Sequence, residues 1–192
     1  MAYWFTADTH FGHANILRHC SRPWTSAEEM DAALIDSINR SVREEDVLFH
    51  LGDFCFRPEQ AADYRNRIRC RNIVLVPGNH DPWPAGNSRG KAFAGLFTEV
   101  CPLVERNLTV DGRRQPVVLC HYAMRRWNKS HYGSWHLYGH SHGRLPDDPQ
   151  ALSWDVGVDC NGYAPVSLAK VRQIMAGKDF KPFRKERTND ER

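Results

Sequence analysis

The sequence predicts an α/β protein, because short apolar segments with strand character alternate with amphipathic helical segments along its 192 residues. The first three strand-like segments are 3–7, 47–51 and 73–76, and helical patterns separate them. Short polar motifs rich in Asp, Asn and His follow the strands directly. In layered α/β proteins ligands bind outside the carboxyl ends of the strands, so we expect these motifs to meet at one edge.

The first strand, 3–7, ends at Asp8-Thr9-His10. In an extended chain, Asp8 and His10 would point to the same face. Such a pair is weak evidence by itself, since it occurs by chance in many proteins and an isolated Asp8 is better explained as a turn carboxylate. Ser26-Ala27-Glu28-Glu29 is a capping box, and apolar residues follow it at helical spacing, which predicts a helix over 26–42.

The second strand, 47–51, leads into Gly52-Asp53, where the glycine lets the backbone approach whatever the carboxylate holds. We expect Pro58 to start a second helix. The third strand, 73–76, leads into Pro77-Gly78-Asn79-His80-Asp81, which places an amide, an imidazole and a carboxylate on consecutive residues. Three such side chains in a row are an unusual way to build a plain turn.

The second half of the chain repeats the pattern of strands that end in histidine motifs. One strand delivers His121, and another delivers Gly139-His140-Ser141-His142. His140 and His142 are again two residues apart. The other expected elements are a short helix at 88–97, strands at 100–104, 107–110, 116–120, 135–138 and 154–158, a hairpin at Asp111-Gly112, and a last helix from Pro165.

Composition predicts one globular domain, 1–176, followed by a polar tail, 177–192, that we expect to be disordered. The chain shows no signal-peptide pattern and no stretch approaching the ~20 apolar residues of a membrane span, so we expect a cytoplasmic protein without membrane contact. The six cysteines are scattered, which favours free thiols. The net charge of +3 does not favour a nucleic-acid partner, and the oligomeric state stays open.

Together the polar motifs form a candidate metal centre. Carboxylate, amide and imidazole ligands suit borderline divalent ions, and we expect manganese first, with iron, zinc, nickel or cobalt as alternatives. The donors are too many for one ion and suit two ions about 3.5–4 Å apart. The candidate ligands are Asp8, His10, Asp53, Asn79, His121, His140 and His142.

The order D-x-H, G-D, G-N-H-D, H and G-H-x-H resembles that of the calcineurin-like metallophosphoesterases, and the resemblance extends over 3–175. It implies a four-layer α/β/β/α sandwich with the site at the sheet edge. It also implies two metal sites that share Asp53 and a bridging hydroxide. The first would be held by Asp8, His10, Asp53 and His142, and the second by Asp53, Asn79, His121 and His140.

The resemblance assigns catalytic roles to two further residues. His80 is expected to face the substrate and to protonate the leaving oxygen, with Asp81 orienting it. The bridging hydroxide would attack phosphorus in line, without a covalent intermediate. The protein Ser/Thr phosphatases carry G-D-x-x-D-R-G and G-N-H-E, which this chain lacks. The chain looks closer to the short bacterial and phage-type phosphoesterases.

Two groups of polar residues are candidates for binding a non-scissile part of the substrate. They are His13, Asn15 and Arg18 after the first motif, and Arg125, Arg126 and Trp127 after His121. Trp127 could stack on a base, although a solvated basic loop is an equally good interpretation of the second group.

We therefore expect a hydrolase of a small phosphodiester or nucleotide derivative. The alternatives are a nuclease acting on DNA or RNA ends and an inactive scaffold with the same fold. The near-neutral body argues against the nuclease, and the intact ligand set argues against the scaffold.

Overall fold

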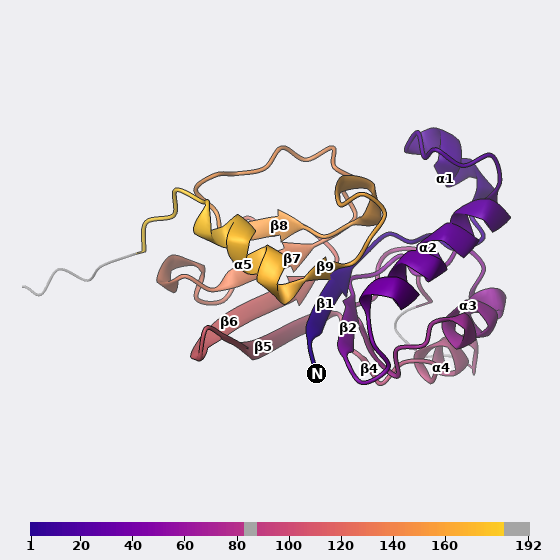
Figure 1. Cartoon of the computed structure of the whole chain (residues 1–192), viewed down its shortest axis with the longest axis horizontal. Coiled ribbons are helices and arrows are strands. Elements are labelled where there is room, and N and C mark those ends of the chain that lie inside the picture. Colours follow the sequence, from indigo (N-terminus) through magenta and orange to yellow (C-terminus); the bar gives the residue numbers. More distant parts are fainter. Residues whose placement is uncertain (83–87, 183–192) are drawn as a thin grey trace, which may run out of the picture.

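A computed structural model describes residues 1–82 and 88–182, which form two β-sheets with helices around them (Figure 1). The first sheet has the strand order β4-β3-β2-β1-β9. Strands β1 to β4 are parallel and β9 is antiparallel to β1. Their bounds are β1 Tyr3–Thr6, β2 Val47–His50, β3 Asn72–Leu75, β4 Glu99–Val100 and β9 Val166–Ser167.

The second sheet has the strand order β5-β6-β7-β8. Strands β5 and β6 form the predicted antiparallel hairpin around Asp111-Gly112, and β6, β7 and β8 are parallel. The strands are β5 Leu103–Val110, β6 Arg113–Cys120, β7 Trp135–Tyr138 and β8 Ser153–Asp155.

The helices gather on different parts of the two sheets. Figure 1 shows α2, α3 and α4 on the side of the molecule that carries β2 and β4, whereas α5 contacts β1, β8 and β9. The helices are α1 Ala14–His19, α2 Ala27–Ser41, α3 Ala61–Arg67, α4 Ser88–Ala94 and α5 Leu168–Ala176, with 3-10 turns at Pro58–Gln60, Ser130–Tyr132 and Val158–Cys160.

Alternation along the strands divides the core into two layers. Leu48 and Ile73 point to one face of the first sheet and pack with Leu34 of α2. Phe5 and Phe49 point to the other face and pack with residues of the second sheet. The central strands β2 and β3 are therefore buried on both sides, as expected for parallel strands. This arrangement confirms the predicted α/β sandwich of two sheets flanked by helices.

Several element boundaries differ from the prediction. The helix expected over 26–42 is α2, and the Ser26 side chain caps it by accepting a hydrogen bond from the Glu29 N–H at 3.1 Å. The two strands expected at 100–104 and 107–110 are not the observed ones, because β5 pairs with β6 continuously over Leu103–Val110. The last helix begins at Leu168 and not at Pro165, because Val166 and Ser167 pair with β1.

Residues 177–182 of the predicted tail make contacts with the domain. The Lys178 ammonium pairs with Asp147, and Phe180 packs against the core between the sheets. The remaining part of the predicted tail, 183–192, lies outside the described residues. Within 1–82 and 88–182, no helix is both long and apolar enough to cross a bilayer.

Candidate metal centre

The polar motifs converge because the strands that carry them run in the same direction. Strands β1, β2 and β3 are parallel, so their carboxyl ends lie at one edge, and β6 and β7 bring the histidine motifs to the same place. Among the described residues, three groups have ligand atoms within 4.8 Å of one another, and one of them, Cys20, His142 and Asp159, shares His142 with the predicted set. The other two consist of predicted ligands alone. They are Asp8, His10 and His142, and Asp53, His121 and His140.

Asp53 connects the two groups. Its Oδ2 lies 3.5 Å from the Nε2 of His10 in the first group and 3.5 Å from the Nε2 of His121 in the second. The Oδ1 of Asn79 lies 3.2 Å from the same His121 Nε2, so Asn79 joins the second group. The structure therefore brings all the predicted ligands together and divides His140 from His142.

The backbone delivers these side chains by an unexpected conformation. Asp8 and His10 have φ angles of 60° and 50°, and His140 and His142 have φ angles of 67° and 48°. The two residues of each pair are thus left-handed and not extended, so the expected alternation along a strand is wrong. Asp53 is also left-handed, at 54°. Such conformations cost about 1–3 kcal/mol each and concentrate at functional sites.

Glycines allow the ligand-bearing segments to approach one another closely. A Cβ on Gly78 would lie 2.3 Å from the Asp53 Oδ1, and one on Gly139 would lie 2.8 Å from the Asp8 Oδ2. A Cβ on Gly52 would lie 2.6 Å from the His121 Nδ1. These distances are too short for any side chain, so glycine is required at each of the three positions.

Hydrogen bonds fix the tautomers of two histidines. The His121 Nδ1 lies 2.7 Å from the Leu51 carbonyl, and the His142 Nδ1 lies 2.7 Å from the Asp159 carboxylate. Both oxygens accept, so each Nδ1 donates its proton and each Nε2 keeps a lone pair for a ligand.

Burial and charge both indicate that the site is built for cations. Both ring nitrogens of His10 are buried without a hydrogen-bond partner. Burial lowers the pKa of His10, and the nearby His142 lowers it further. Burial raises the pKa of Asp8 well above its usual value, and Asp53 and Asp155 raise it further. A cation would relieve the crowding of carboxylates and use the His10 lone pair, so these residues fit a divalent metal.

The predicted role of Asp81, orienting His80, is not what the structure shows. The Asp81 carboxylate accepts hydrogen bonds from the N–H groups of Asp53 at 2.8 Å, Phe54 at 3.0 Å and Gly78 at 2.9 Å. Burial raises the pKa of Asp81 to about 7. Asp81 thus ties together the turns that carry Asp53 and Asn79.

His80 lies at the mouth of the site. Its side chain is exposed, and its ring centroid lies 5.2 Å from that of His10. Its backbone N–H donates to the Asp53 Oδ1 at 3.0 Å, which fixes the turn against the shared ligand. This position suits a residue that contacts a bound substrate.

Two residues that support the site were missed from the sequence. The Arg22 side chain is fully buried, and its Nε and Nη2 each donate to Asp159 at 2.8 Å. Arg22 also donates to the Asp8 carbonyl at 2.7 Å and to the Thr9 carbonyl at 3.0 Å. Arg22 and Asp159 are 137 positions apart, so no local pattern could have joined them.

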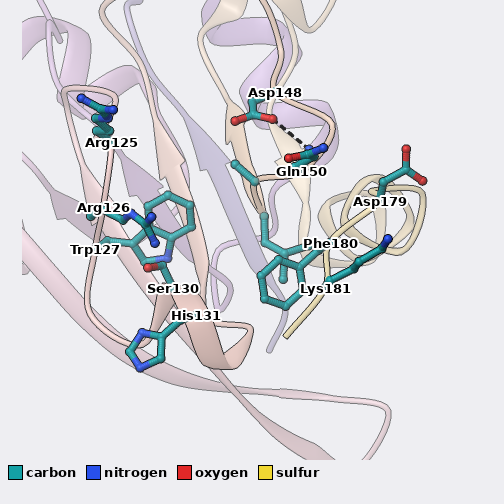
Figure 2. A pocket seen from close by; sticks show the side chains of 12 residues that line it. Arg125, Arg126, Trp127, Ser130, His131, Asp148, Gln150, Asp179, Phe180 and Lys181 are labelled. Atoms are coloured by element: carbon teal, nitrogen blue, oxygen red, sulfur yellow. Dashed lines mark hydrogen bonds between the residues drawn. The ribbon is translucent and has the colours of Figure 1, made fainter. Parts of the chain in front are cut away.

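The predicted substrate residues fall in different places. The His13 ring lies 5.5 Å from that of His10 and stacks on Phe56 at 4.0 Å, beside the site. Asn15 and Arg18 are exposed on α1. Arg125, Arg126 and Trp127 line a separate cavity, whose lining includes none of the candidate metal ligands (Figure 2).

Comparisons with known proteins agree with this geometry. Residues 1–152 match the model of the calcineurin-like phosphoesterase superfamily domain. An uncharacterized protein of Methanocaldococcus jannaschii is 31% identical over 176 residues, which cover 88% of each chain. A protein of unknown function from Aquifex aeolicus has a similar fold, with a TM-score of 0.65 at 18% identity, over 90% of this chain and 98% of that one. The chain therefore belongs to the calcineurin-like phosphoesterase superfamily.

Proposed function

We propose that this protein is a phosphoester hydrolase that depends on two divalent metal ions, with manganese as the first candidate. The observation that carries the proposal is the position of the Asp53 carboxylate, 3.5 Å from a ligand nitrogen of each of the two groups. When bound, two such ions would supply a hydroxide nucleophile at neutral pH and neutralise charge on the phosphoryl oxygens. We take a small phosphodiester or nucleotide derivative as the substrate.

We assign a separate role in the site to each of these residues. Asp8, His10 and His142 would hold one ion, and Asn79, His121 and His140 the other, with Asp53 holding both. His80 would hold the proton that passes to the leaving oxygen, because its exposed ring stands beside His10 at the mouth of the site. His80, Asn79 and His140 are all exposed, which leaves the site open to a phosphoester from solvent.

The test is turnover by the metal-loaded protein. Metal-free protein is reconstituted separately with manganese, nickel or zinc and assayed on a chromogenic phosphodiester and the matching monoester. We expect turnover with at least one metal. His80→Ala should lower kcat by about 10²–10⁴-fold without changing metal content. His19→Ala, which removes another exposed histidine, is the matched control and should change neither.

Each alternative has a distinct outcome. If folded, metal-loaded protein turns over neither ester with any metal, the hydrolase proposal fails and the scaffold remains. If single-stranded DNA is cleaved much faster than the small diester, the substrate is nucleic acid. If Asn79→Ala retains two bound ions and full activity, the assignment of the second metal site is wrong.

A further inference from the structure

The cavity lined by Arg125, Arg126 and Trp127 has a volume of about 940 Å³ and lies at the end of β7 and β8 that is opposite to the candidate metal centre. The Trp127 Nε1 in its wall donates to the carbonyl of Ser134, directly before β7, and Leu152 in its wall directly precedes β8. His140 follows the other end of β7. Six residues of extended chain span about 20 Å, so the two sites are separate.

Three cationic residues without an ion pair in the described part of the chain line this cavity. Arg125 and Arg126 come from the loop between β6 and β7, and Lys181 comes from the segment after α5 (Figure 2). Among the described residues these three cations form no ion pair, although Asp148 and Asp179 line the same cavity. Free guanidinium groups are the usual partners of phosphate in proteins.

Two aromatic rings also line the cavity, and both are held in place. Trp127 packs on His136 with ring centroids 5.1 Å apart, while its Nε1 donates to Ser134 at 3.0 Å. Phe180 packs against the core between the sheets. Figure 2 shows the two rings coming from opposite walls. Fixed aromatic rings of this kind are suited to stack on a base.

The C-terminal wall is fixed to the rest of the domain before any ligand binds. The Lys178 side chain is only 4% exposed; it pairs with Asp147 and donates to the Asp148 carbonyl at 3.1 Å. The Asp179 N–H donates to the Pro149 carbonyl at 2.8 Å. These bonds hold Phe180 and Lys181 beside Asp148, so binding would require little further ordering of the chain.

We propose that this cavity is a nucleotide-binding site distinct from the metal centre. Arg125 and Arg126 bind the phosphate, and the base lies between Trp127 and Phe180. The Asp148 and Asp179 carboxylates accept hydrogen bonds from the sugar hydroxyls. They also disfavour a continuous nucleic-acid strand, whose further phosphates they would repel. The volume falls within the range of about 300–1,000 Å³ typical of small-molecule sites.

Binding is tested on the metal-loaded protein with AMP, adenosine and inorganic phosphate as probes, by tryptophan fluorescence and calorimetry. We expect AMP to bind with a Kd on the order of 1–100 µM, and adenosine and phosphate to bind at least about tenfold more weakly, since each lacks half of the contacts. Arg126→Gln should weaken AMP binding by about tenfold or more. Arg114→Gln, at an exposed position of β6, is the matched control and should not.

The Asn79→Ala variant separates this cavity from the metal centre, because it alters only the latter. AMP affinity that survives Asn79→Ala and falls with Arg126→Gln supports the proposal. The reverse pattern would place the nucleotide at the metal centre and overturn it. Absence of saturable AMP binding at millimolar concentration would also overturn it. Tighter binding of an oligonucleotide than of AMP, with a steep salt dependence, would likewise overturn the proposal.

Discussion

At the scale of single residues, the candidate metal centre is supported by a buried ion pair between Arg22 and Asp159. Arg22 and Asp159 form an ion pair with two hydrogen bonds, and Asp159 also accepts a hydrogen bond from the His142 Nδ1. The side chains of Arg22 and Asp159 are 0% and 6% exposed, so solvent cannot replace either partner. Arg22 and His142 together hold the pKa of the Asp159 carboxyl below its usual value, which keeps it an acceptor.

Replacing Asp159 should therefore weaken metal binding. We expect Asp159→Ala to lower the affinity for one ion by about 10–100-fold, because His142 loses the partner that fixes its tautomer and orientation. Calorimetric metal titration measures the change, and thermal unfolding checks that the fold survives. Asp159→Asn keeps an acceptor oxygen and should lose less. Asp63→Ala, at the surface of α3, should lose nothing, and unchanged metal affinity in Asp159→Ala would refute the positioning role.

Substitution of Gly78, which lies beside the candidate metal centre, should also weaken metal binding. Gly78→Ala would place a Cβ 2.3 Å from the Asp53 Oδ1 and 2.7 Å from the Asp53 N, so one of these segments must move. We expect loss of the second metal ion and at least about tenfold lower turnover. Gly95→Ala, whose nearest neighbour would be at 3.4 Å, is the control. Elemental analysis measures the metal content of the Gly78→Ala and Gly95→Ala variants. A wild-type metal content in Gly78→Ala would contradict the steric argument.

The sequence is sufficient to identify the side chains that the structure brings together at this edge, but not the residues that hold them in place. Asp8, Asp53 and His121 each follow a strand, and that local pattern is visible without a structure. For Asp81 the sequence predicts a contact with His80, whereas the observed partners of its carboxylate are backbone N–H groups of the turn after β2. The left-handed conformations of the ligands have no marker in the sequence, since Asp and His adopt them only where the surroundings enforce them.

At the scale of elements, helix α2 shows how local signals define a boundary. The Ser26 side chain accepts from the Glu29 N–H, as the capping box predicts. The Glu29 carboxylate, however, accepts from the N–H and hydroxyl of Thr25 and not from the Ser26 N–H. The start of the helix is therefore fixed by the Ser26 side chain, which binds the Glu29 N–H, and by the Glu29 side chain, which binds Thr25.

Removing this cap should affect stability and not catalysis. We expect Ser26→Ala to lower the free energy of unfolding by about 1 kcal/mol, because the Glu29 N–H loses its acceptor. Ser37→Ala, within the same helix, should be neutral or slightly stabilising, because alanine favours helix more than serine does. Urea denaturation of both variants gives the difference, and equal midpoints would show that the cap contributes nothing.

Elements defined by tertiary pairing were predicted less well. Val166 and Ser167 follow a proline and precede an apolar helical pattern, so the sequence favours a helix there. They form β9 because the edge of β1 is available to pair with them. Strand β5 continues through 105–106 for the same reason, since Val118 and Val117 of β6 lie opposite those residues. Pairing partners distant in sequence leave no local pattern.

At the scale of the whole molecule, the fold gathers ligands from positions 8 to 142 and places like charges together. Asp8 and Asp53 are at most 2% exposed, so water does little to screen the repulsion between their carboxylates. Bound cations would therefore stabilise the folded protein by linking residues of the two sheets, in addition to any role in catalysis. Any ion that binds only the folded state raises its stability by mass action.

Metal removal should accordingly lower thermal stability, and by an amount that depends on pH. At a free ion concentration of 100 times Kd, one site should add about 2.7 kcal/mol to the free energy of unfolding. Burial raises the pKa of Asp8 in the metal-free fold, so between the unfolded and the folded pKa the fold retains a proton that the unfolded chain has lost. As pH falls, this proton stabilises the metal-free fold and competes with the ion. The difference in stability between the metal-bound and the metal-free protein should therefore become smaller.

The measurement is thermal unfolding with manganese and with EDTA at pH 5, 6 and 7.5. We expect the gap in Tm to be widest at pH 7.5 and smallest at pH 5. Asp8→Asn removes both the negative charge and the titration, so its gap should be small and nearly independent of pH. Equal Tm values with and without manganese at pH 7.5, or a gap that widens as pH falls, would show that Asp8 does not hold an ion.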